Sequence, residues 1–236
     1  MFIRPFATFP HPNVWAGFVS IFFVLFFEKI KKNLMSKNTL DFTLSWVLLF
    51  IIPLSIFLSF SKSAWFIFFS FLLIQTFLDK PYPKLRWLIT SFVLFCLGGV
   101  FVSRIQSLWY EDSQSISERL VLANIAIKIF TTQPWFGIGV GNFLKTLPSF
   151  TEGVYILQPV HSTYLLLLSE TGIWGVSGFL GLIVIAVLKS FSNNRDVFFS
   201  LIVILFLGIV DHYLLTLSQG QLILGLILGL SLNKKT

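Results

Sequence analysis

Apolar segments follow one another along almost the whole chain and constrain its fold more than any other feature. A helix that crosses a bilayer needs about 20 mostly apolar residues. Charged residues make up only 11% of the chain, whereas soluble domains carry about 25%. The segments that qualify, some of them with their flanks, are 14–27, 42–60, 64–78, 87–102, 173–188, 197–215 and 221–232. The sequence therefore predicts an all-α polytopic membrane protein with about seven transmembrane helices, forming a single membrane domain over residues 1–236.

Basic residues occur between alternate apolar segments, within residues 29–37, 80–86, 189–195 and 234–235. Lysine and arginine favour cytoplasmic loops, so this alternation predicts the orientation of a multi-pass protein with its N-terminus outside. Residues 103–161, between the fourth and fifth segments, then form one large external loop. The net charge of +7 is explained by this topology, so membrane lipids are expected as partners and nucleic acid is not.

The external loop contains a stretch, SQSISERLVLANIAIKIFTTQP, that reads as a surface helix. Ser115 and Glu118 have the spacing of a capping box at its start, and Pro134 supplies its end. Its expected apolar face consists of Ile116, Leu120, Ile127 and Phe130. A tight loop with Gly137, Gly139 and Gly141 follows, and it lacks the preceding strand and the spacing of a nucleotide-binding loop.

Titratable and cationic side chains gather at the external ends of the predicted spans. They include all three histidines, His11, His161 and His212, together with Arg4, Lys62, Arg104, Arg119, Lys145, Glu170 and Asp211. Ionisable groups at membrane depth are costly and usually serve a function. Cations beside an imidazole indicate work on an anionic substrate at the outer face.

Each of these residues also has a structural interpretation. His161 can cap a helix or lie at the interface as an amphipathic ring, Lys62 can anchor the interface, and Asp211 and His212 can pair with each other. Arg119 is expected in the first turn of its helix, where the dipole disfavours a cation by about 0.3–1 kcal/mol, so Glu118 or an anionic ligand should offset it. Three scattered histidines give only a weak case for a metal, and no metal or other cofactor is predicted.

Several ordered segments resemble the O-antigen ligase and O-antigen polymerase family of bacterial membrane glycosyltransferases. The most specific is HSTYLLLLSETGIWG, in which His161, Ser162, Gly172 and Gly175 fit the family's pattern H-[NSQ]-x9-G-x-x-[GTY] in full. The other segments are TFPHPNVWAGF with His11, Pro12 and Asn13; SFSKSAWF, where Lys62 stands in place of a frequent arginine; SERLVLANIAIKIFTTQPWFGIGVGNF; and GIVDHYLL with Asp211. Family members usually carry further spans before the HPN segment, so the chain is expected to correspond to their C-terminal part.

The resemblance implies transfer of a glycan from a polyprenyl-pyrophosphate carrier to a glycan or lipid acceptor, as in lipopolysaccharide biosynthesis, at the external (periplasmic) face of the bacterial cytoplasmic membrane. Arg119 and His161 are the implied catalytic residues. Arg119, with Lys62, would neutralise the leaving pyrophosphate, and His161 would act as general base or hold phosphate as a cation. Further substrate-binding residues are expected at Arg104, Asn142, Lys145 and Ser162. Structural motif residues are expected at His11, Pro12, Asn13, Gly137, Gly139, Gly141, Gly172, Gly175 and Asp211.

The segment from His161 onward is expected to begin as a short helix whose residues 165–168 pack toward the bilayer. Glu170, Thr171 and Gly172 should break it from the true span, which starts near Ile173. A polar break at membrane depth is tolerated where it lines a protein cavity. Two other functions remain open from the sequence: a transporter or flippase of an anionic or lipid-linked glycan, and an inactive truncated remnant that needs a partner.

Overall fold

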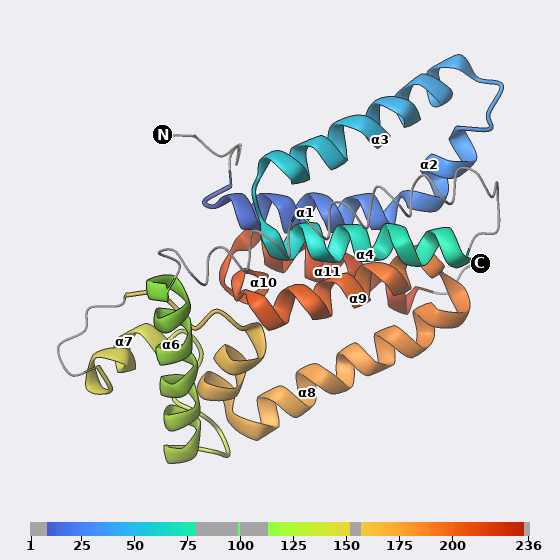
Figure 1. Cartoon of the computed structure of the whole chain (residues 1–236). Coiled ribbons are helices and arrows are strands. Elements are labelled where there is room, and N and C mark those ends of the chain that lie inside the picture. Colours follow the sequence, from blue (N-terminus) through green and yellow to red (C-terminus); the bar gives the residue numbers. More distant parts are fainter. Residues whose placement is uncertain (1–8, 79–98, 100–112, 152–156, 234–236) are drawn as a thin grey trace. The chain divides into compact units, whose positions relative to one another are not determined.

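The computed structural model describes residues 9–78, 99, 113–151 and 157–233, and every regular element in this part of the chain is a helix (Figure 1). This confirms the all-α class. The elements are α1 (Pro12–Leu25), α2 (Phe27–Asn33), α3 (Thr39–Leu58), α4 (Lys62–Leu78), α6 (Ser113–Thr132), α7 (Phe143–Thr146), a 3-10 turn (Leu147–Ser149), α8 (Thr163–Asn193), α9 (Arg195–Val210), α10 (Tyr213–Thr216) and α11 (Ser218–Leu232). The predicted span 87–102 lies outside the described residues, apart from Gly99.

Two of the described helices, α3 and α8, are long and apolar enough to cross a membrane. Helices α1 and α2 count as a third candidate if they form one span, although they meet at a bend of 57°. Helices α4 and α11 are apolar but shorter. The described part of the chain therefore contains two or three candidate crossings, and the predicted number of seven is not confirmed.

The chain divides into two compact units, of which the first comprises Met1–Gln106 and Asn194–Val203. Its described core is aromatic, since Phe23 of α1 is 1% exposed and its ring lies 5.0 Å from that of Phe68 on α4. Phe71 contacts Phe27 at 5.1 Å and Phe199 of α9 at 5.6 Å. Edge-to-face and tilted rings at these separations are favourable packing arrangements, so phenylalanine holds α1, α2, α4 and the start of α9 together.

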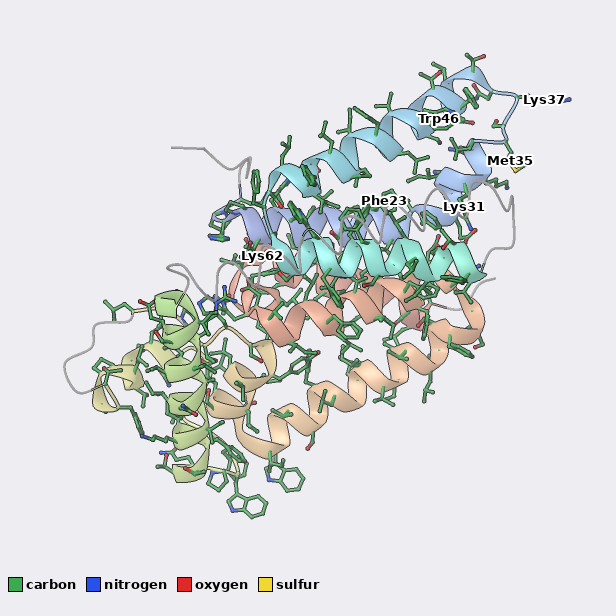
Figure 2. The ribbon with its side chains drawn as sticks, in the orientation of Figure 1. Phe23, Lys31, Met35, Lys37, Trp46 and Lys62 are labelled. Atoms are coloured by element: carbon green, nitrogen blue, oxygen red, sulfur yellow. The ribbon has the colours of Figure 1, made fainter. Side chains whose placement is uncertain are left out.

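Charged and polar side chains meet at one end of this first unit. Glu28 of α2 pairs with Lys31 at 2.7 Å and with Arg195 of α9 at 3.6 Å, and Arg195 also donates to Gln75 of α4. Figure 2 shows Lys31 and Lys37 at this end of the helices and Lys62 at the opposite end of α4. Lys31 and Arg195, which belong to two of the four predicted basic groups, thus lie close to the same carboxylate, while Lys62 lies at the other end of the same unit.

The second unit comprises Ser107–Asn193 and Ile204–Thr236. In its core α6 packs against α7, the 3-10 turn and the start of α8, through Leu122, Ile125, Ala126, Ile129, Phe143, Leu147, Val160 and Leu166. Leu166 is 3% exposed and Leu165 packs against the same core, so these two of the residues 165–168 pack on this core rather than toward the bilayer as predicted. The described side chains thus form a small apolar core of their own around α6.

Helix α6 confirms that this stretch is helical but corrects two details of the prediction. Its buried face is Leu122, Ile125, Ala126 and Ile129, whereas Leu120 and Ile127 of the predicted face are 60% and 46% exposed. The helix begins at Ser113, two residues before the start expected from the sequence. Arg119 consequently lies in the second turn, where the dipole penalty expected from the sequence has largely fallen off.

Candidate active site

The break in α8 is real and lies at Gly172, whose backbone has φ 63° and ψ −164°. A non-helical residue leaves the preceding carbonyl groups without intrahelical partners. The loop after α6 supplies partners: the amides of Ile138 and Gly139 donate to the carbonyls of Ser169 and Glu170, at 3.1 and 2.8 Å. In return the Ile173 amide donates to the Pro134 carbonyl at 2.9 Å. The predicted break therefore forms a backbone junction with the glycine loop.

Two glycines allow this junction to close. A Cβ atom on Gly172 would lie 2.5 Å from the backbone of Trp135, and one on Gly137 would lie 2.4 Å from the backbone of Glu170. Both residues have positive φ, a backbone conformation that residues other than glycine rarely adopt. Gly139 and Gly141 also have positive φ, as a tight loop requires. The glycines predicted as motif residues thus have structural roles at this junction.

Glu170 links the junction to α7. Its side chain is 9% exposed, and Oε1 accepts a hydrogen bond from the amide of Phe143, the first residue of α7, at 3.2 Å. Asn142 precedes α7 and donates from Nδ2 to the Ile138 carbonyl at 3.0 Å. Asn142 therefore braces the loop, and its predicted contact with substrate stays a prediction. The carboxylate of Glu170 was noted in the sequence, but its partner could not be predicted because it lies 27 residues upstream.

Replacing Glu170 by alanine is expected to destabilise the second unit by about 1–3 kcal/mol, since a buried amide loses its acceptor. Glu170→Gln keeps an oxygen acceptor at the same place and is expected to retain most of that stability. Thermal unfolding of the two variants in detergent would measure the difference. Equal unfolding temperatures for the alanine and glutamine variants would contradict the capping role.

His161 lies just before α8 and is half-buried. The turn around it is fixed to the end of α9, because Thr163 donates to the Asp211 carbonyl from both its amide (3.0 Å) and its hydroxyl (2.8 Å). Ser162 donates to the Gly208 carbonyl at 3.5 Å, and Tyr164 donates to the Leu205 carbonyl at 2.9 Å. The last carbonyls of a helix need such partners, and the polar start of α8 supplies them to Gly208 and to Asp211 at the end of α9.

The hydrogen bonds of His161 indicate its tautomer. Nε2 lies 3.3 Å from the amide oxygen of Gln158, and an amide oxygen only accepts. His161 therefore donates from Nε2 when neutral, which leaves the lone pair on Nδ1. The second ring nitrogen, Nδ1, is then the basic atom of the neutral imidazole, and it is buried from solvent in this structure.

His212 lies beside His161, with the two ring centroids 5.7 Å apart. Helix α9 ends at Val210, so Asp211 and His212 lie in the turn after it rather than inside a span reaching residue 215. The Asp211 carboxylate accepts from the His212 amide at 2.8 Å, so the two residues do pair locally. Burial lowers the pKa of His212, and the negative charge of Asp211 opposes that shift.

The structure brings some of the predicted residues together and leaves others apart or untested. Ser162, Gly172 and Asp211 join His161 in the second unit through the contacts above. Arg119 on α6 and Lys145 on α7 are exposed in the same unit. Arg104 lies outside the described residues. Gly175 lies against the Thr171 side chain, so that its Cβ would be 2.0 Å from Oγ1.

The HPN segment and Lys62 belong to the first unit. His11 is the N-cap of α1, where its Nδ1 accepts from the Asn13 amide at 3.1 Å, and Pro12 is the first helical residue. Proline suits this position because its missing N–H would have no partner there. The motif therefore starts a helix. Lys62 is the first residue of α4.

Sequence reasoning did not include His212, Gln158 and Thr216 among the site residues. His212 carried a signal, since all three histidines fall at the same ends of the predicted spans. Thr216 lies four residues after His212, and its Oγ1 is 2.7 Å from the Nδ1 atom of His212. Gln158 lies in an irregular stretch without periodicity, so no pattern pointed to it.

These features define an all-helical protein with candidate membrane-spanning helices and a polar site at the broken end of one of them. The family model described as O-antigen ligase matches residues 46–180, more than half of the chain, and the chain therefore belongs to that family. This confirms the resemblance, and the family is one of enzymes. A comparison with curated proteins found no match. The matched segment includes Arg119, His161 and Gly172, whereas Asp211 and His212 lie beyond it.

Proposed function

We propose that this protein transfers a glycan from a polyprenyl-pyrophosphate carrier to an acceptor hydroxyl at the external face of the cytoplasmic membrane. The observation that carries the proposal is the packing of α6, which bears Arg119, against the turn that bears His161. Leu122, one helical turn after Arg119, belongs to the same buried core as Val160, the neighbour of His161.

Arg119 and His161 also lie at similar distances from the junction between α6 and α8, which supports the proposal. Helix α6 and the first part of α8 both run toward the same junction, where the Ile173 amide is hydrogen-bonded to the Pro134 carbonyl. Figure 1 shows α6 beside the first part of α8. A helix rises 1.5 Å per residue, so the 15 residues from Pro134 back to Arg119 span about 22 Å. The 12 residues from Ile173 back to His161 span about 18 Å. The difference is less than one helical turn.

The chemistry requires a cation and a base. When the glycosyl bond to the carrier breaks, negative charge develops on the pyrophosphate, and the planar guanidinium of Arg119 can donate two parallel hydrogen bonds to its oxygens. The acceptor hydroxyl loses its proton as its oxygen attacks the anomeric carbon, and the Nδ1 lone pair of His161 receives that proton. A single displacement of this kind inverts the anomeric configuration. Lys145 and Ser162 are proposed to hold further parts of the substrate.

The roles of Lys62 and Arg104 in substrate binding remain predictions from the sequence. Lys62 offers a compact point charge where arginine would offer a fork. If Lys62 contacts the pyrophosphate, Lys62→Arg should retain transfer activity and Lys62→Ala should lose it. Rates measured for the two variants at equal membrane levels would test this prediction.

A reconstituted assay tests the proposed function directly. Purified protein in detergent is given a polyprenyl-pyrophosphate-linked glycan and an acceptor glycolipid, and the product is detected by its mass. Transfer in detergent, where no sealed compartment exists, would separate an enzyme from a transporter. Absence of product in detergent, combined with movement of the lipid-linked glycan across vesicles, would reject the proposal in favour of a flippase.

A further inference from the structure

We propose that His161, Asp211 and His212 form a binding site for a borderline-soft divalent cation of the Zn²⁺ type, and that the bound cation inhibits glycan transfer. The inhibitory part rests on the proposed function, whereas the binding site itself does not. The three residues each offer one ligand atom, and these atoms all lie within 4.8 Å of one another.

The geometry requires only small side-chain movements. Tetrahedral zinc with bonds of about 2.0–2.1 Å places its ligand atoms about 3.3 Å apart. The observed separations of up to 4.8 Å therefore close by at most about 1.5 Å per pair, which rotations about side-chain bonds can supply. All three residues are half-buried, but Nδ1 of His161 is itself buried from solvent, so a cation reaches that atom only when the surrounding side chains rotate away.

Hydrogen bonds to neighbouring side chains orient the imidazole rings of His161 and His212. Nδ1 of His212 lies 2.7 Å from the Thr216 hydroxyl, which itself donates to the His212 carbonyl at 3.2 Å. When that hydroxyl gives its single hydrogen to the carbonyl, Nδ1 is the donor and the lone pair of His212 lies on Nε2. His161 is held in the same way by Gln158, with its lone pair on Nδ1. Such outer hydrogen bonds orient the imidazoles of metal sites and fix their tautomers.

The backbone that carries the ligands is also held in place. His161 comes from the turn before α8, and Asp211 and His212 come from the turn after α9. Thr163 joins the two turns through its paired hydrogen bonds to the Asp211 carbonyl. The fold therefore brings these ligands, which are far apart in sequence, close together before any cation binds, so cation binding loses little further conformational entropy.

The ligand set selects the kind of cation. Two imidazoles and one carboxylate leave a fourth position open, as in several zinc sites. Mg²⁺ and Ca²⁺ prefer oxygen ligands, and only one of the three side chains offers oxygen. Imidazole nitrogen suits Zn²⁺, Cu²⁺ and Ni²⁺. We therefore expect Zn²⁺ to bind and Mg²⁺ to bind much more weakly.

The inhibition follows from the lone pair of His161. The proposed mechanism uses Nδ1 to receive the proton of the acceptor hydroxyl, and the proposed cation uses the same lone pair as a ligand. One electron pair cannot serve both at once, so bound Zn²⁺ removes the base. No bond of the substrate changes in this step, and a chelator restores activity.

Calorimetric titration of the tag-free protein in detergent with ZnCl₂ tests the site without any glycan substrate. We expect one Zn²⁺ per chain, and at least tenfold weaker binding in each of His161→Ala, Asp211→Ala and His212→Ala. Thr216→Val removes only the outer hydrogen bond and should weaken binding about 10–100-fold. His11→Ala removes the histidine at the start of α1 and should leave binding unchanged. MgCl₂ serves as the matched cation control, and gel filtration identifies variants that do not fold.

The outcomes separate the two parts of the proposal. Zinc affinity equal to that of the unchanged protein in both His212→Ala and Thr216→Val would overturn the site. Zinc that binds through these residues but leaves transfer unaffected would overturn the inhibition. A protein that binds zinc as expected but transfers no glycan even with chelator present would reject the proposed function while the binding site stands.

Discussion

Replacing His161 by alanine is expected to lower the rate of glycan transfer about 10²–10⁴-fold, the usual contribution of a general base. Arg119→Ala should lower the rate about 10²–10³-fold, because the leaving pyrophosphate loses a charged donor. The rate constant for transfer from lipid-linked donor to acceptor in detergent measures both effects. Surface glycan in cells that express each variant gives a second readout.

Lys128→Ala is a matched control for Arg119→Ala. Lys128 is also an exposed cation of α6, but it lies nine residues later, and nine residues at 3.6 per turn place it on the opposite face of the helix. Its removal should leave the rate unchanged. If Arg119→Ala and Lys128→Ala reduce transfer equally, α6 contributes only general positive charge, and the assignment of the guanidinium to the pyrophosphate is wrong.

Gly172→Ala is expected to have the largest effect on folding. A Cβ atom there would lie 2.5 Å from the backbone of Trp135, and backbone cannot move aside as the end of a flexible side chain can. The φ of 63° with ψ of −164° belongs to a region that is essentially reserved for glycine. Strain of about 1–3 kcal/mol thus adds to the clash, and the loop of residues 134–139 should separate from α8.

The result is measurable as a lower unfolding temperature and as faster proteolysis between α6 and α8. Gly137→Ala should behave alike, since its Cβ would meet the backbone of Glu170 at 2.4 Å. Gly178→Ala is the control within α8, because a Cβ there meets no described atom within 4 Å and alanine favours the helix by up to about 1 kcal/mol. Similar losses in Gly172→Ala and Gly178→Ala would show that the junction does not hold the unit together.

The break in α8 could be predicted because a Glu-Thr-Gly sequence interrupts an otherwise apolar run. Its partner could not, because the junction consists of backbone hydrogen bonds from a loop about 35 residues upstream. Backbone groups are the same in every residue and leave no trace in the amino-acid pattern. The glycines that permit the close approach were visible, but their spacing alone does not show what they approach.

Helix α6 shows a different limit of sequence patterns. Its existence followed from its composition and from Pro134, yet the predicted apolar face was wrong at Leu120 and Ile127, which are exposed. Apolar residues occur on more than one side of this helix, so periodicity alone cannot select the side that is buried. Packing selected Leu122, Ile125, Ala126 and Ile129, because this stripe faces the start of α8 and the turn around Phe143.

The amino-acid sequence by itself determined the helical class, the position of the break in α8 and the histidine motif that marks the family, because each is written in residues that are neighbours in the chain. The tertiary structure decided which groups meet: the glycine loop with the break, Glu170 with α7, and His161 with Asp211 and His212. These partners lie about 30–50 residues apart in the chain. Only the hydrogen bonds and the packing between distant segments bring them within reach of one another.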